Sequence, residues 1–134
     1  MRGRVKLSLL LAGLICGACG EVSMPRRPDL PASVSPGWTR KSYEASAPPP
    51  GLPDPAAPVC WKAEYAGTGS SAEVWACGYR GSGSAFDAEQ RARAEANTVK
   101  FQEGNYLVIA KWNGGSRAEV TALIRAVQRS LQTK

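Results

Sequence analysis

The stretch VCWKAEYAGTGSSAEVWACGY, residues 59–79, decides the fold that we expect for this chain. Apolar and polar side chains alternate on both sides of its centre, and a period of two is typical of strands. Gly67-Thr68-Gly69-Ser70 at the centre has the composition of a turn. The stretch therefore predicts a β-hairpin made of residues 59–66 and 72–79.

The register of this hairpin follows from two patterns that agree. If Ala66 pairs with Ser71 across the four-residue loop, the apolar residues of the two strands face each other. The same register places Cys60 directly opposite Cys77, and a cross-strand disulfide needs a facing, non-hydrogen-bonded pair. We therefore expect a Cys60–Cys77 disulfide, which would close a loop of about 16 residues and stabilise the fold by about 3 kcal/mol in the chain-entropy model.

Two segments after the hairpin have the features of helices. Residues 84–96 are rich in alanine, and we expect Ser84 to be the N-cap with Asp87 at the third helical position. Ser116-Arg117-Ala118-Glu119 is a capping box. The helix that it opens carries an apolar stripe, made of Val120, Leu123, Ile124, Val127 and Leu131.

A second hairpin is expected between the two helices, from residues 98–103 and 105–112 around Glu103-Gly104. A two-residue turn there would place Phe101 opposite Tyr106. The order of elements, (β)ββαββα, then predicts an α+β fold. We expect a mainly antiparallel sheet of four to five strands with two helices packed on one face.

The composition of the chain changes sharply in its first half, because all ten prolines lie within residues 25–58. We expect residues 19–58 to be a Pro-rich linker and residues 59–134 to be one small α+β domain. Residues 37–44 are a candidate first strand; the alternative is a tether with two stray aromatic side chains. A free segment over residues 20–36 would reach roughly 50 Å at about 3.1 Å per residue.

The chain begins with the pattern of an export signal. Arg2, Arg4 and Lys6 form a basic leader, and residues 7–15 form an apolar run. That run is too short to span a bilayer as a helix, which takes about 20 residues. We therefore expect residues 1–18 to be a cleaved signal peptide.

The export signal ends in small residues followed by a cysteine, because Cys19 follows Gly17 and Ala18. This ending resembles the lipobox of bacterial lipoproteins, although Cys16 stands at the −3 position, where the family usually has an aliphatic residue. The resemblance implies that Cys19 receives acyl chains and anchors the protein to the membrane. Gly20, in place of the Asp that retains lipoproteins at the inner membrane, implies the outer membrane in a Gram-negative cell. The alternative is an ordinary signal cleaved before the same cysteine, which would give a periplasmic or secreted protein.

Residues 60–131 are also similar in pattern to uncharacterised domains of bacterial secreted proteins and lipoproteins. The similarity is carried by an Ala85-Phe86 helix start and by Phe101-Gln102-Glu103-Gly104-Asn105-Tyr106-Leu107-Val108. It includes no known catalytic residue, so it implies no activity.

Charge and composition exclude several classes of function. The chain has a formal net charge of +6, but three of its 17 basic residues lie in the signal, which leaves 14 basic and 11 acidic side chains. This mild excess does not predict nucleic-acid binding, which needs a concentrated basic stripe. Histidine is absent, so His-dependent triads and the commonest zinc ligand are excluded, and we expect neither a metal nor a cofactor.

The register of the first hairpin suggests one candidate binding surface. It places Trp75 opposite Lys62 on the outward face, as a cation–π pair. We expect a non-catalytic binding or accessory domain whose partner is an envelope protein or a glycan. The alternative is an envelope enzyme that uses carboxylates, such as Glu64 and Glu73, or a redox-active disulfide.

Overall fold

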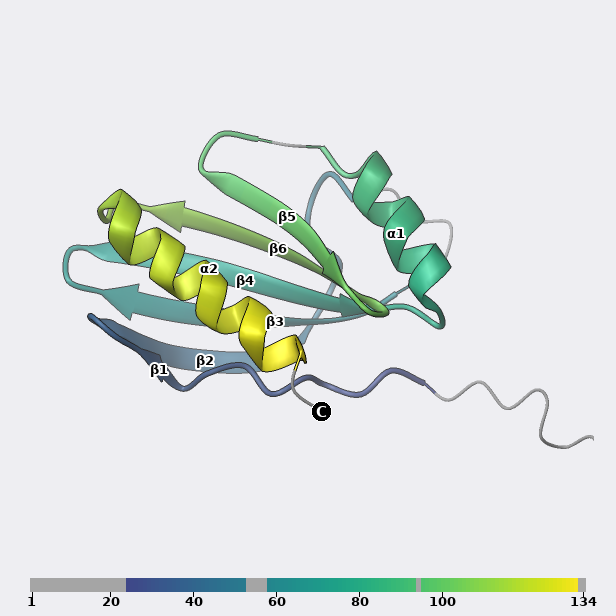
Figure 1. The fold of residues 1–134 in the computed structure, drawn as a ribbon, viewed down its shortest axis with the longest axis horizontal. Coiled ribbons are helices and arrows are strands. Elements are labelled where there is room, and N and C mark those ends of the chain that lie inside the picture. Colours follow the sequence, from purple (N-terminus) through teal and green to yellow (C-terminus); the bar gives the residue numbers. More distant parts are fainter. Residues whose placement is uncertain (1–23, 53–57, 94, 133–134) are drawn as a thin grey trace, which may run out of the picture.

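The chain forms a six-stranded antiparallel sheet with two helices (Figure 1), in a computed structural model that describes residues 24–52, 58–93 and 95–132. The strand order is β1-β2-β3-β4-β6-β5. The α+β class and the antiparallel pairing are confirmed, but the sheet has more than the four to five strands expected. Its elements are β1 Ser33–Val34, β2 Trp38–Ser46, β3 Val59–Gly67, β4 Ser70–Gly78, α1 Ser82–Arg91, β5 Thr98–Glu103, β6 Tyr106–Asn113 and α2 Arg117–Gln132.

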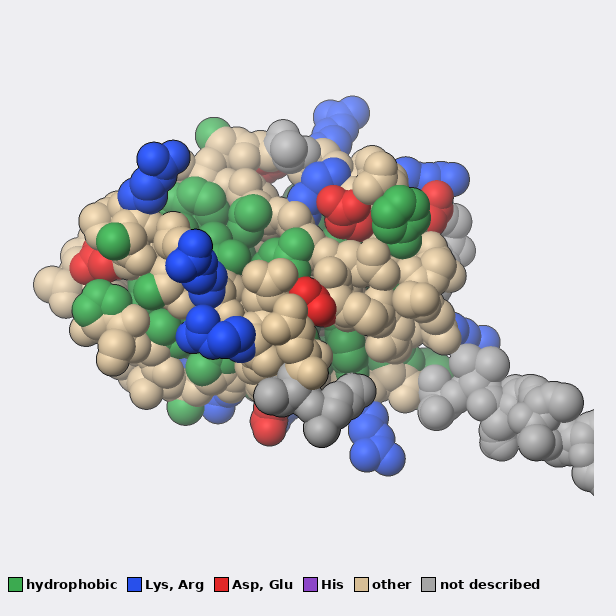
Figure 2. Space-filling model, in the orientation of Figure 1, with side chains coloured by type: hydrophobic (Ala, Val, Ile, Leu, Met, Phe, Trp, Pro, Cys, Tyr) green, Lys and Arg blue, Asp and Glu red, His purple; other side chains and the backbone are tan. Residues whose placement is uncertain are grey.

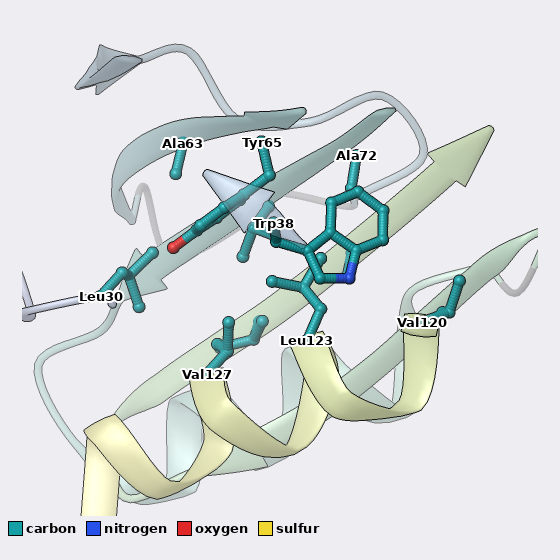
Figure 3. Packing of buried hydrophobic residues seen from close by; sticks show 11 residues of the cluster. Leu30, Trp38, Ala63, Tyr65, Ala72, Val120, Leu123 and Val127 are labelled. Carbon is teal, nitrogen blue, oxygen red and sulfur yellow. The ribbon is translucent and has the colours of Figure 1, made fainter. Parts of the chain in front are cut away.

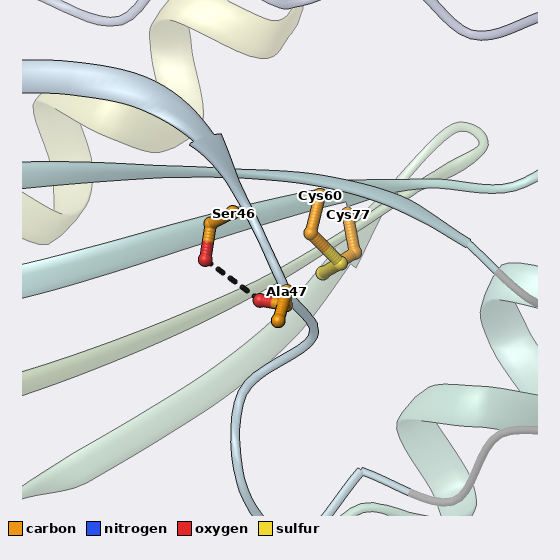
Figure 4. Close-up of a disulfide and its surroundings, with 4 residues drawn as sticks. All are labelled: Ser46, Ala47, Cys60 and Cys77. Carbon is orange, nitrogen blue, oxygen red and sulfur yellow. Dashed lines mark hydrogen bonds between the residues drawn. A yellow bond between two sulfur atoms is a disulfide. The ribbon is translucent and has the colours of Figure 1, made fainter.

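The first hairpin, β3 with β4, has the predicted register. Ala66 pairs with Ser71, and Cys60 pairs with Cys77. The two cysteines form a disulfide, which lies beside the end of β2, where Ser46 pairs with Cys60 (Figure 4). The apolar alternation and the cysteine positions were therefore a sound basis for the register.

The second hairpin, β5 with β6, differs from the expected register by two residues. Its turn is Gly104-Asn105, so Glu103 pairs with Tyr106 and Phe101 pairs with Val108. Gly104 has a φ of 60°, a left-handed conformation that glycine adopts at little cost. The predicted pairing of Phe101 with Tyr106 is wrong, but a shift of two residues keeps every side chain on its expected face.

The two helices lie on opposite faces of the sheet, which corrects the expectation that they share one. We call these the α2 face and the α1 face. The core of the α2 face includes Val74 and Val108, together with Leu123 of α2. The core of the α1 face contains Cys77 of β4 and Leu107 of β6, together with alanines of α1. Because β4 and β6 carry apolar side chains on both faces, each face needs its own cover.

On the α2 face, the sheet curls around α2, which contacts both edge strands, β1 and β5. Trp38 of β2 is 2% exposed and points at this helix (Figure 3). Its indole Nε1–H donates to the carbonyl of Glu119 at 2.8 Å. The predicted capping box is present, because Ser116 and Glu119 exchange hydrogen bonds between side chain and backbone. The tryptophan contact holds the first turn of α2 against β2, which belongs to the first half of the chain.

On the α1 face, α1 begins at Ser82 with Gly81 as N-cap, so the expectation of a Ser84 cap is wrong. The helix also ends at Arg91, earlier than expected. Lys100 of β5 donates to two carbonyls at this end, those of Glu89 at 2.6 Å and Ala92 at 2.8 Å. A lysine ammonium at a helix C-terminus satisfies carbonyls that have no partner within the helix.

The segment 25–32, which we call the strap, crosses the α2 face beside α2 instead of hanging free. Leu30 is 4% exposed and belongs to the core of this face. Three tyrosine hydroxyls donate to strap carbonyls: Tyr106 to Arg26, Tyr43 to Pro28 and Tyr65 to Pro31.

The strap and β2 therefore move the start of the folded unit to about residue 25. The candidate strand 37–44 is present as β2, and the boundary expected at residue 59 does not separate linker from domain. A hypothetical Cβ on Gly78 would lie 2.4 Å from Cβ of Pro25, so only glycine lets the strap cross β4 here.

We predict that the strap makes stability fall at alkaline pH. Burial raises the pKa of Tyr65 to about 12 and also raises that of Tyr43, from ordinary values of 10.0. The folded chain thus keeps a Tyr65 proton that the unfolded chain loses above pH 10. The contribution of the protonated Tyr65 hydroxyl to folding stability is therefore intact below pH 10 and is lost as pH rises toward 12. For Tyr65 alone the loss is about 1.4 kcal/mol per pH unit in this window.

Urea unfolding between pH 8 and 11.5 measures this effect. We expect Tyr65→Phe to be less stable than the parent at pH 8, because the Pro31 carbonyl loses its donor. Above pH 10 the variant should lose stability less steeply with pH. Equal slopes for the two proteins would contradict the assignment.

Candidate binding surface on the α1 face

The α1 face is covered over only part of its area. α1 and residues 47–52 cover the end that holds the disulfide, and Leu52 belongs to the same core. The other end is an open depression of about 480 Å³ that extends from β2 to β6. We define the open surface as its charged residues and their ion-pair partner, which are Lys41, Lys62, Glu64, Glu73 and Lys111.

Lys62 is the centre of a small network on this surface. Its ammonium lies 3.0 Å from a Glu73 carboxylate oxygen and 3.6 Å from one of Glu64. The hydrogen bond to Glu73 is the main cause that raises the pKa of Lys62. The side chains are partly exposed, so the pairs contribute little to stability.

Trp75 lies on the α1 face, where the register placed it, and the Lys62 ammonium lies 5.4 Å from the centre of its ring. However, Trp75 is only 8% exposed, although the register predicted that it would point outward. The ring lines a narrower depression of about 180 Å³ whose walls are the segment Pro49-Pro50-Gly51 and the residues that follow α1. Glu73 and Lys111 line both depressions, so the two form one continuous surface.

This surface can bind a ligand that presents both donors and acceptors. Lys41 and Lys111 lie on it with Glu64 and Glu73, and Trp75, which lines the narrower depression, offers an apolar contact. Glu64 and Glu73 face each other across the strand pair and share one ammonium group, which is the arrangement of a surface ion-pair network.

The disulfide is buried below the opposite end of the same face. Cys60 is 3% exposed and Cys77 is 1% exposed. Catalytic and redox-sensing cysteines are characteristically accessible to solvent, whereas this pair lies in a core with Leu52 and the alanines of α1. Its position is that of a structural bridge.

Sequence reasoning missed the strap and the cover over Trp75. The signal for the strap was the spacing of Pro25, Pro28 and Pro31, which repeats every three residues as in a polyproline II helix. Such a segment leaves its carbonyls free, and buried tyrosine hydroxyls need acceptors. Cys19, the predicted lipidation site, lies outside the described residues.

Comparison of the chain with models of known protein families, with curated proteins and with solved structures finds no match. Among the residues that the structure describes, no helix is long and apolar enough to cross a bilayer. Within the same residues, no group of three or more Cys, Asp or Glu is placed to hold a metal ion.

We predict that Glu73 dominates the electrostatics of the open surface. Glu73→Gln removes the largest cause of the raised Lys62 pKa, which should fall toward its ordinary value of 10.5 in an NMR titration of the lysine side chain. Glu64→Gln is the matched control and should lower this pKa less, because its carboxylate lies farther away. The free energy of unfolding should change by less than about 1 kcal/mol in both variants. Equal pKa changes in the two variants would refute the assignment.

Proposed function

We propose that the protein is an exported lipoprotein, anchored through Cys19, whose domain is a non-catalytic binding or accessory module at the bacterial cell envelope. The proposed location at the cell envelope rests on the signal pattern of residues 1–18 and on the lipobox-like end at Cys19. The Cys60–Cys77 disulfide supports it, because such bridges persist in oxidising compartments. In a Gram-negative cell, Gly20 after the cysteine favours the outer membrane.

The binding role rests on one observation, the open surface of the α1 face. There, charges of both signs lie near a tryptophan, along the two depressions that Glu73 and Lys111 both line. A partner with alternating polar groups, such as an extended segment of an envelope protein or a glycan, matches this chemistry. The enzymatic alternative has weaker support, because the disulfide is buried and Glu64 and Glu73 are ion-paired to Lys62.

The anchor is tested by the mass of the N-terminal peptide from the membrane fraction. We expect the added mass of diacylglycerol and an acyl chain on Cys19. After a high-salt wash, which releases proteins held by charge alone, Cys19→Ser should be lost from the membrane fraction, whereas Cys16→Ser, the matched control, should remain there. An unmodified N-terminal peptide in the soluble fraction would overturn the anchor and leave a periplasmic or secreted protein.

The binding surface is tested by a photoreactive residue placed in cells at either of two exposed positions. At Lys111, on the open surface, irradiation should link the protein to one envelope component. At Ala118, on the exposed side of α2, the same residue should give no such adduct. Adducts that are the same at both positions, or none at Lys111, would count against the role of this surface.

A further inference from the structure

The strap fixes the point at which the chain enters the domain. Pro25 packs over Gly78 of β4, and Tyr106 donates to the next carbonyl, that of Arg26, at 2.5 Å. Met24, the first described residue, is five residues after Cys19. Five residues span at most about 18 Å when fully extended. If Cys19 is the anchor, as proposed above, this end of the sheet lies close to the bilayer and not roughly 50 Å away from it.

Basic side chains gather around this entry point, which Figure 2 shows on both sides of the place where the described chain begins. We define the exit patch as Met24, Arg26, Arg27 and Arg80, all of them exposed. Met24 is 58% exposed, and its sulfur lies 3.9 Å from Nη2 of Arg80. These residues come from two places in the sequence: Met24, Arg26 and Arg27 lie at the start of the described chain, and Arg80 lies two residues after the end of β4.

Among the described residues, no ion pair neutralises the positive charge of this patch. The ion pairs within the described ranges involve Lys62 and Arg91, and not the three arginines of the patch. Asp29, on the strap, is the acidic residue closest to them in sequence. The carboxylate of Glu103, at the end of β5, accepts hydrogen bonds from two glutamines of α2 and not from the arginines of the patch.

Arg27 also has a structural contact, which matters for the design of a test. Its Nη1 donates to the carbonyl of Tyr43 at 3.0 Å, and its guanidinium lies 4.4 Å from the centre of the Tyr43 ring. Removing Arg27 would therefore disturb the strap as well as the charge. Within the described ranges, Arg26 and Arg80 make no comparable side-chain contact with the core, so they can be changed with less risk to the fold.

We propose that the exit patch binds anionic phospholipid headgroups and holds this end of the sheet against the membrane. The inference rests on the proposed lipid anchor for its biological setting, but the patch itself is a property of the folded domain. The arginines supply charge, and the apolar side chain of Met24 extends toward the headgroup region. Each basic side chain near an anionic bilayer contributes about 1 kcal/mol, which is about a fivefold increase in partitioning.

The test uses the chain from residue 20, which contains every described element and both cores, without any lipid on it. It is sedimented with vesicles of phosphatidylcholine alone or with added phosphatidylglycerol. We expect binding only to the anionic vesicles, and less binding at high salt. Arg26→Gln with Arg80→Gln should weaken binding by on the order of 30-fold.

The matched control is Arg117→Gln with Arg125→Gln, which removes the same charge from the exposed side of α2. It should weaken binding by much less. Circular dichroism and thermal unfolding check that both variants are folded. Equal losses in the two variants, binding to neutral vesicles as strong as to anionic ones, or no binding would overturn the proposal.

These outcomes separate the two proposals. Unmodified Cys19 together with patch-dependent vesicle binding would refute the lipid anchor and retain a peripheral membrane site. Acylated Cys19 together with a failed vesicle experiment would retain the anchor and refute the patch.

Discussion

The central strands β4 and β6 impose the constraint on which the rest of the fold depends. Val74 and Trp75 are neighbours in the chain, so their side chains lie on opposite faces of the sheet, and both are buried. Leu107 and Val108 repeat this arrangement on β6. A sheet that is apolar on both faces must be covered on both. The chain has only two helices among its described residues, and the shorter, α1, buries only the small side chains of Ala85 and Ala88, so irregular segments provide the remaining cover.

Proline-rich segments serve as this additional cover. The strap closes the α2 face beside α2, and residues 47–52 lie over Trp75 and the disulfide region on the other face. A segment rich in proline cannot extend the sheet as a regular strand, because proline has no backbone N–H to donate. Its carbonyls remain available, and the hydroxyls of Tyr43, Tyr65 and Tyr106 use them. The apparent linker is therefore part of the folded unit.

The two candidate surfaces lie toward opposite ends of the sheet. The open depression is lined by residues near the β3–β4 turn, such as Ala66 and Ser71, whereas the exit patch adjoins Gly78 at the other end of β4. Seven residues of strand separate Ser71 from Gly78, which is roughly 23 Å. A domain held to a membrane by the exit patch would present the open depression to partners away from the bilayer. Membrane attachment and partner binding would then not compete.

The sequence by itself determined the local structure: the first hairpin and its register, the disulfide, the capping box of α2 and the Lys62–Trp75 contact. These follow from period-two alternation and short-range spacing, which depend on residues close together in the chain. Tertiary structure alone decided that the helices take opposite faces, that the strap docks and that Trp75 is covered. Each of these depends on contacts between segments distant in sequence, such as Trp38 with Glu119 or Arg26 with Tyr106. A one-dimensional pattern shows which side chains need burial, but the segment that buries them is chosen by the packing of the whole chain.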